Sequence, residues 1–167
     1  MKNTFLKTIS GAALAIFMLA MFAQVQVSAQ ILQEVPPGQS RDLEGSWTTQ
    51  VTFRNCQTGA AIRTFPAMNT FMRGGTMQEF GVGSAPLTRG PGHGVWSHQS
   101  GQRYSSNFQF FRFNADGTFA QTVRVRRQIE LSQSGNNYTA TATSEVFDTT
   151  GNLVMTGCAT EVGTRFE

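Results

Sequence analysis

The chain has 167 residues, with 13 basic and 10 acidic side chains and a formal net charge of +3. Lys2 and Lys7 are its only lysines, and both lie in a leader of 29 residues that we expect to be removed. The mature chain then keeps 11 arginines against 10 acidic groups, which argues against a nucleic acid or an anionic membrane as partner, because both need a concentrated basic surface. The remaining ~138 residues suffice for one domain with a buried core.

Residues 1–29 have the three parts of a secretory signal peptide. They are a positively charged start, an apolar run over residues 11–22, and the small-residue cleavage site Val27-Ser28-Ala29. We therefore predict cleavage after Ala29 and a secreted or periplasmic protein. The apolar run is shorter than the ~20 residues of a transmembrane helix, so we expect no membrane span in the mature chain. An uncleaved anchor is the alternative.

Residues 30–43 contain Pro36-Pro37-Gly38 and no apolar periodicity, and we predict a flexible tail before a single domain over residues 44–167. In this domain Trp47 and Val51 begin an alternation of apolar and polar residues, which is the period of a half-buried β-strand. Turns rich in Gly, Asn and Ser divide the rest into similar segments. The predicted strands are 45–54, 61–73, 76–81, 93–99, 103–113, 118–133, 138–148 and 153–167.

Eight strands and no helical periodicity after residue 30 predict an all-β protein. Short turns between consecutive strands favour an eight-stranded antiparallel up-and-down barrel. A two-sheet sandwich is the alternative. A barrel of eight strands either is filled by its own side chains or holds one small ligand.

Cys56 and Cys158 are the only cysteines. If the first and last strands pair in antiparallel fashion, Cys56 lies opposite Cys158 and Trp47 lies near Arg165. Because an exported chain enters an oxidising compartment, we expect a disulfide between the two cysteines. Two separate buried thiols are the alternative.

This pairing of the first and last strands has one conflict. The apolar residues are odd-numbered in the first strand but even-numbered in the last, where they include Val154, Val162 and Phe166. A strict pairing would place the two apolar faces on opposite sides of the sheet. We therefore assume one β-bulge between the strands.

Gly45-Ser46-Trp47, at the start of the first strand, resembles the Gly-x-Trp motif of lipocalins. In that family the Trp closes one end of the barrel and an Arg of the last strand packs over it, and Arg165 falls in that place. The second lipocalin motif has no clean match, and no helix follows the last strand. The chain is similar to small exported lipocalin-like (calycin-type) bacterial proteins of unknown activity, which implies a barrel that binds an apolar ligand and assigns no catalytic residue.

Arg127 lies among apolar residues on the odd-numbered face of strand 118–133. Facing inward, its guanidinium would clamp a ligand carboxylate. The alternative is a bulge near residue 126 that turns Arg127 outward. In strand 138–148 the small residues Ala140, Ala142 and Ser144 leave room for a cavity or for neighbouring aromatic rings. The residues that we expect to face a ligand inside the barrel are Tyr104, Phe108, Phe119, Val123, Arg127 and Tyr138.

The leading hypothesis is a binding protein for a small, largely apolar ligand. One alternative is an isomerase or cyclase resembling allene oxide cyclase, with an inward Glu79 or Glu145 beside Tyr104. Another is a filled barrel that acts through its surface. We assign no cofactor and no metal, since His93 and His98 point to opposite faces of one strand and have no third ligand nearby. Composition does not decide the oligomeric state.

Overall fold

The computed structural model describes residues 42–166. The predicted signal peptide and residues 30–41 of the predicted tail lie outside the described residues. Within residues 42–166, no helix is both long enough and apolar enough to cross a membrane. Their regular structure is eight β-strands and the short 3₁₀ turn η2 (Pro86–Thr88).

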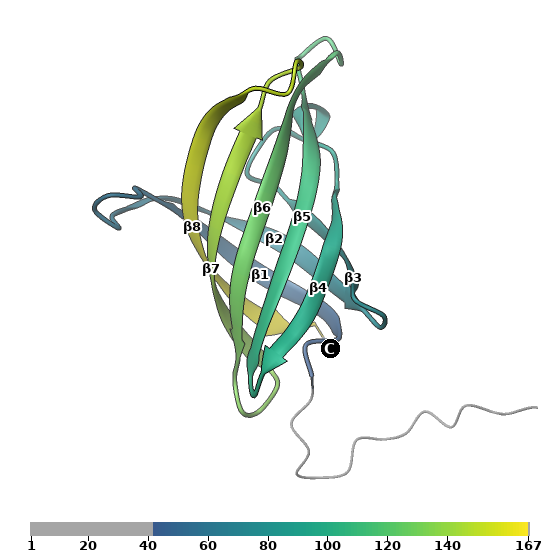
Figure 1. Ribbon diagram of the computed structural model, residues 1–167, viewed down its shortest axis with the longest axis vertical. Coiled ribbons are helices and arrows are strands. Elements are labelled where there is room, and N and C mark those ends of the chain that lie inside the picture. Colours follow the sequence, from purple (N-terminus) through teal and green to yellow (C-terminus); the bar gives the residue numbers. More distant parts are fainter. Residues whose placement is uncertain (1–41, 167) are drawn as a thin grey trace, which may run out of the picture. The chain divides into compact units, whose positions relative to one another are not determined.

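The strands form a closed antiparallel barrel in which each strand pairs with its sequence neighbours and the last pairs with the first (Figure 1). The predicted up-and-down barrel is confirmed, and the sandwich is excluded. Three strands have the predicted bounds, and the others differ by at most two residues at an end. The strands are β1 (Gly45–Arg54), β2 (Ala61–Met72), β3 (Thr76–Gly81), β4 (Gly92–Ser100), β5 (Arg103–Phe113), β6 (Phe119–Leu131), β7 (Asn137–Phe147) and β8 (Leu153–Arg165).

The outer surface of four neighbouring strands carries a row of threonines. Thr141 of β7 pairs with Thr160 of β8, which pairs with Thr52 of β1, which pairs with Thr64 of β2. The hydroxyls of Thr52 and Thr64 are 2.8 Å apart and hydrogen-bonded. β-Branched side chains fit a pleated sheet and interact across strands, so these residues favour strands without contributing to the core.

β1 and β8 pair without interruption from Trp47 opposite Arg165 to Arg54 opposite Cys158. The β-bulge that we assumed is absent. The assumption was wrong because the apolar residues of β8 were placed inside: Val162 is 55% exposed on the outer surface. Where β8 pairs with β1, its interior positions are polar or small, and include the buried Glu161 and Gly163.

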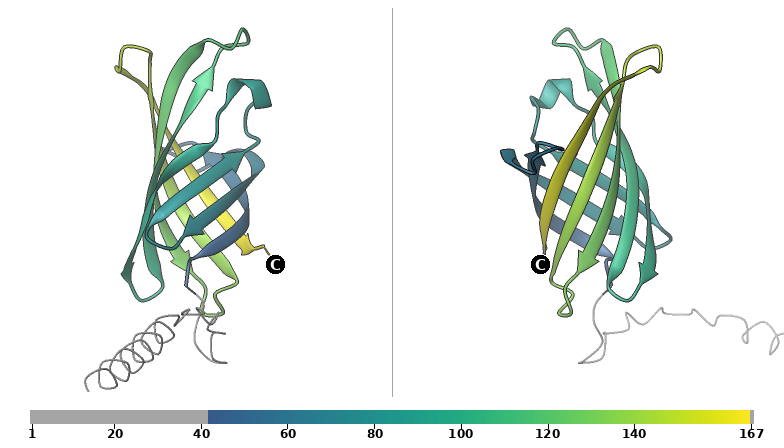
Figure 2. Two further views of the ribbon diagram at one scale, coloured as in Figure 1. Left: turned by 90° about the vertical axis from the view of Figure 1, so that its right-hand side faces the viewer. Right: turned by 60° about the vertical axis from the view of Figure 1, so that its left-hand side comes forward.

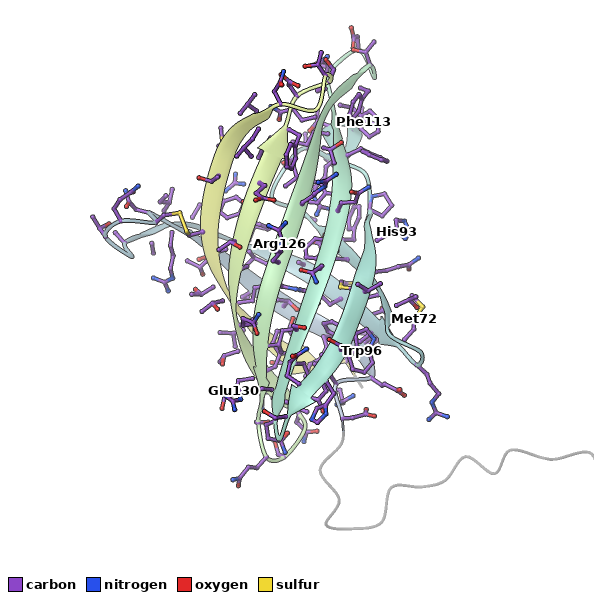
Figure 3. The ribbon with its side chains drawn as sticks, in the orientation of Figure 1. Met72, His93, Trp96, Phe113, Arg126 and Glu130 are labelled. Carbon is purple, nitrogen blue, oxygen red and sulfur yellow. A yellow bond between two sulfur atoms is a disulfide. The ribbon has the colours of Figure 1, made fainter. Side chains whose placement is uncertain are left out.

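Cys56 and Cys158 form the predicted disulfide, with 5.3 Å between their Cα atoms. Cys158 is the residue at which the pairing of β8 with β1 ends. Residues 153–157 of β8 continue beyond this point and pair with β7 alone among the described strands. The disulfide, drawn in yellow in Figure 3, therefore joins the two strands where they separate.

The connections between strands define two ends of the barrel, which we call the closed end and the mouth. The turns 73–75, 101–102 and 132–136 lie at the closed end, and the connections 55–60, 82–91, 114–118 and 148–152 lie at the mouth. Strands β5 to β8 extend further on the mouth side than β1 to β3 do (Figure 2). The two ends therefore differ in construction.

The domain begins earlier than we expected. Leu43, which we assigned to the tail, is completely buried. Its carbonyl oxygen accepts a hydrogen bond of 3.0 Å from the indole N–H of Trp47. Leu43 therefore belongs to the core at the closed end.

Candidate functional site

Trp47 and Arg165 seal the closed end of the barrel. The guanidinium carbon of Arg165 lies 4.3 Å from the centre of the Trp47 ring, and its two terminal nitrogens donate hydrogen bonds of 2.6 Å to the carbonyl oxygens of Asp42 and Glu44. The Trp47 ring also meets the ring of Tyr138 edge-on, at 5.0 Å. This is the contact that the Gly45-Ser46-Trp47 motif led us to expect, and it fills the end of the barrel with side chains.

Arg127 points into the barrel. The pairing of β6 with β5 and β7 shows no bulge near residue 126, so the alternative in which Arg127 turns outward is excluded. Its guanidinium donates hydrogen bonds to Glu161 (2.9 Å), Asn69 (3.0 Å) and Ser106 (2.8 Å). Burial is the largest single influence and lowers the pKa of Arg127, but the charge and hydrogen bond of Glu161, together with Tyr138 and Glu79, raise the pKa above its ordinary value. The guanidinium of Arg127 is therefore bound by other side chains of the protein and does not clamp a ligand carboxylate.

Tyr138 completes the packing of the closed half. Its hydroxyl hydrogen-bonds with the hydroxyl of Thr49 at 2.8 Å and accepts a hydrogen bond of 3.1 Å from the side-chain amide of Asn69. Burial raises the pKa of Tyr138 well above its usual range. Both Tyr138 and Arg127 are fully buried, so protein side chains, and not a ligand, occupy this part of the interior.

The small residues of β7 face inward, as expected. Ala142 pairs with Arg127 of β6, and Ala140 pairs with Glu161 of β8. The space beside these alanines accommodates the long side chains of their cross-strand neighbours. Of the two possibilities, a cavity or filling by neighbours, the structure shows filling, by the ion pair of Arg127 and Glu161 and by a core cluster with aromatic rings that includes Ala140.

The other residues that we expected to face a ligand divide into two groups. Tyr104, Phe108 and Val123 are buried in the interior. Phe119 is 42% exposed and packs edge-on against Phe111 at 5.7 Å. Our placement of Phe119 inside the barrel was wrong, because the register of β5 with β6 shifts between Phe119 and Gln121 and interrupts the alternation there.

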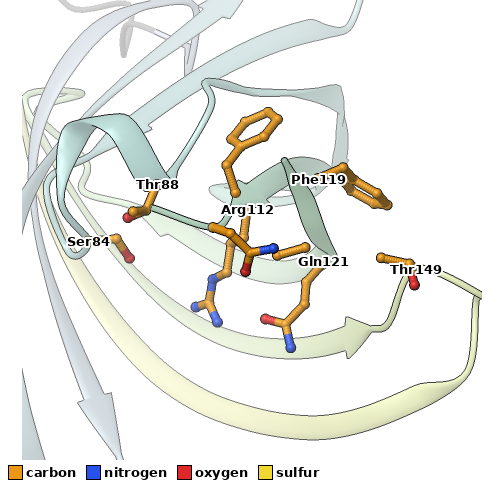
Figure 4. A pocket seen from close by; sticks show the side chains of 9 residues that line it. Ser84, Thr88, Arg112, Phe119, Gln121 and Thr149 are labelled. Atoms are coloured by element: carbon orange, nitrogen blue, oxygen red, sulfur yellow. The ribbon is translucent and has the colours of Figure 1, made fainter. Parts of the chain in front are cut away.

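The mouth holds an open cavity of about 600 Å³ (Figure 4). Its walls come from the end of β5, the start of β6, the 82–91 connection and the turn between β7 and β8. This is the candidate functional site. The residues that line it are Ser84, Thr88, Arg112, Phe113, Asn114, Phe119, Ala120, Gln121 and Thr149.

A buried ion pair joins the 82–91 connection to β3, and its two residues are not among those that line the cavity. Arg89, from the 82–91 connection, donates a short hydrogen bond to the carboxylate of Glu79 on β3. Its guanidinium carbon lies 3.8 Å from the centre of the Phe110 ring. Burial raises the pKa of Glu79, and the nearby charge of Arg89 only partly opposes this. Sequence reasoning missed Arg89; the one signal was the inward position of Glu79, which requires a cationic partner.

Arg112 is the polar centre of the cavity. It is half-buried, and its Nε atom is shielded from solvent with no hydrogen-bond partner among residues 42–166. Burial, and then the charge of Arg89, lower the pKa of Arg112. Its guanidinium extends in the same direction as the amide of Gln121, its partner on β6 (Figure 4).

One of the two carboxylates proposed for an enzyme, that of Glu145, lies away from the barrel interior. Glu145 is on the outer surface, where its carboxylate is 2.8 Å from Arg126, which is labelled in Figure 3. Tyr104 lies in the closed half, where its ring meets those of Trp96 and His98. Among residues 42–166, no three His, Cys, Asp or Glu side chains are grouped to hold a metal ion.

Comparison with protein-family models and with curated proteins finds no match to this chain. The lipocalin-like character suggested by Gly45-Ser46-Trp47 thus stays a prediction.

Proposed function

We propose that the protein binds a small, largely apolar molecule at the mouth of its barrel. The observation that carries this proposal is the difference between the two ends. Trp47 and Arg165 fill the closed end, and the pair of Arg127 and Glu161 fills the middle. The mouth has an open cavity of about 600 Å³, within the size range of small-molecule sites.

The apolar character of the ligand is inferred from the surroundings of the mouth. Phe113, Phe119 and Ala120 form the apolar part of the cavity lining, whose other six residues are polar, and Phe110 of β5 is buried. In the 82–91 connection Leu87 is 85% exposed, and on the mouth side of β8 Met155 is 58% exposed. Apolar side chains that gather in one exposed region mark interaction sites.

A filled barrel that acts through its surface is the second candidate. The packed network around Arg127 favours it, because that network leaves only the mouth for a ligand. The isomerase or cyclase alternative has no such support. Glu145 faces outward and Glu79 is already paired with Arg89.

Fluorescence of the uncharged dye N-phenyl-1-naphthylamine, which increases in apolar surroundings, tests the proposal. We expect a saturable increase at one site per chain. Gln121→Trp, which fills the mouth, should abolish it. Gln128→Trp is the matched control, since Gln128 is exposed on the outer face of the same strand. No increase, or an equal increase with both variants, would favour the filled barrel instead.

A further inference from the structure

We propose that the ligand of the mouth carries a carboxylate and that the guanidinium of Arg112 binds it. The inference rests on the proposed function and adds the chemical class of the ligand. It starts from a contrast among the arginines of the barrel. Arg89, Arg127 and Arg165 each donate hydrogen bonds to carboxylate or carbonyl oxygens of the protein. In the described part of the chain, the side chain of Arg112 has no hydrogen bond or ion pair, and its guanidinium carbon lies 6.0 Å from the centre of the Phe110 ring.

Arg112 is the one charged side chain among the residues that line the cavity. The positive charge of Arg89 is paired with Glu79. Asp116 and Asp148, in turns at the mouth end, direct their carboxylates to groups of their own turns. A ligand with one negative charge would therefore compensate the charge of Arg112 inside the cavity.

The neighbours of Arg112 suit a carboxylate. The side chains of Gln121 and Ser84 line the same cavity, are half-buried, and make no hydrogen bond within residues 42–166. A guanidinium binds a carboxylate through two parallel N–H···O bonds, and amide and hydroxyl groups supply further donors. Phe113 and Phe119 beside these donors provide an apolar surface for the rest of the molecule. The combination fits an amphipathic acid.

The test compares dodecanoate with 1-dodecanol, which has the same chain length and no charge. Each ligand is titrated into protein that has bound N-phenyl-1-naphthylamine, and displacement of the dye is followed at pH 8 and low ionic strength. The ligand concentration is kept below the value at which that ligand aggregates. Because hydrogen bonds to charged groups are stronger than neutral ones, we expect dodecanoate to bind at least about tenfold more tightly. Arg112→Gln should remove this preference, because it weakens the binding of dodecanoate far more than that of dodecanol. Arg124→Gln, which removes the same charge from the exposed outer face of β6, should keep it.

The outcomes separate the two proposals. If both ligands bind wild type equally, the inference is overturned and the proposed function stands. If the dye and both ligands fail to bind, both proposals are overturned. A preference for dodecanoate that survives in Arg112→Gln overturns the role of Arg112. Dodecyl phosphate is the third ligand. If it binds more tightly than dodecanoate, the proposal that the ligand carries a carboxylate is overturned in favour of a ligand that carries a phosphate.

Discussion

Inside the barrel, Nη1 of Arg127 and Oε2 of Glu161 are 2.9 Å apart, and both side chains are almost completely removed from solvent. The pair joins β6 to β8, and Asn69 and Ser106 extend its hydrogen bonds to β2 and β5. Two charges buried without water are stable only when each compensates the other. The interior of this barrel is thus held by a polar network as well as by apolar packing.

Removal of one partner of this pair should destabilise the fold strongly. We expect Glu161→Gln to lower the free energy of unfolding in urea by about 3–5 kcal/mol, because it leaves the Arg127 charge buried and uncompensated. The double variant Arg127→Met/Glu161→Leu should be closer to wild type, since it removes both charges. Arg126→Met, which breaks the exposed pair with Glu145, is the control and should change stability by less than about 1 kcal/mol. A double variant less stable than Glu161→Gln would contradict this account.

Gly163 should tolerate no side chain. It lies opposite Tyr138 in the β7–β8 pairing, and a Cβ atom at Gly163 would be 2.1 Å from the tyrosine ring. We expect Gly163→Ala to cost at least about 1–3 kcal/mol, which is typical of an overpacked core. In Gly157→Ala on the same strand, the nearest atom is the hydroxyl of Ser144, which can rotate away, so the loss should be smaller. Thermal denaturation of both variants makes the comparison, and equal losses would refute the steric explanation.

Reduction of the disulfide should weaken the closure of the barrel. Cys56 and Cys158 are 102 positions apart, and a cross-link over such a loop stabilises the native state by up to about 4.7 kcal/mol in the chain-entropy model. We expect Cys56→Ser/Cys158→Ser to lose up to this amount in urea unfolding. Treatment with a phosphine reductant should bring wild type to the same stability and leave the variant unchanged. A reductant that destabilises both proteins would point to another cause.

Asp148 should make stability depend on pH. The backbone N–H of Asn152 and the hydroxyl of Thr150 lower the pKa of Asp148 to about 2. A lowered pKa means that the stabilisation is present above the unfolded value of 3.8 and is lost as the pH falls through about 2. We therefore expect Asp148→Asn to melt below wild type at pH 6, and the difference to shrink between pH 4 and 2. Melting temperatures measured across this range would disprove the effect if the difference stayed constant.

The strands were predictable because alternation is a local property. Residues such as Trp47 and Val51 define the inner face of β1, and glycine-rich turns mark where strands end. Gly74 and Gly75, both with positive φ, were recognised as the turn between β2 and β3 for this reason. The order of the strands followed from the shortness of these turns.

The interior was harder to predict because its polar groups compensate one another over long separations in sequence. Glu161 faces inward and Val162 outward, the reverse of what hydropathy suggests, because Arg127 neutralises Glu161. The contact of Arg89 with Phe110 could not be predicted from the sequence either. It depends on how an irregular connection folds back over the barrel, and no periodic pattern encodes that path.

Asp42 and Arg165, near the two ends of the described chain, contact each other at the closed end. Strand direction therefore places both on the side of the barrel opposite the mouth. An affinity tag or a surface linkage attached through either of these positions would leave Arg112 facing free solution. Immobilised protein should then capture dissolved molecules without steric obstruction from its support.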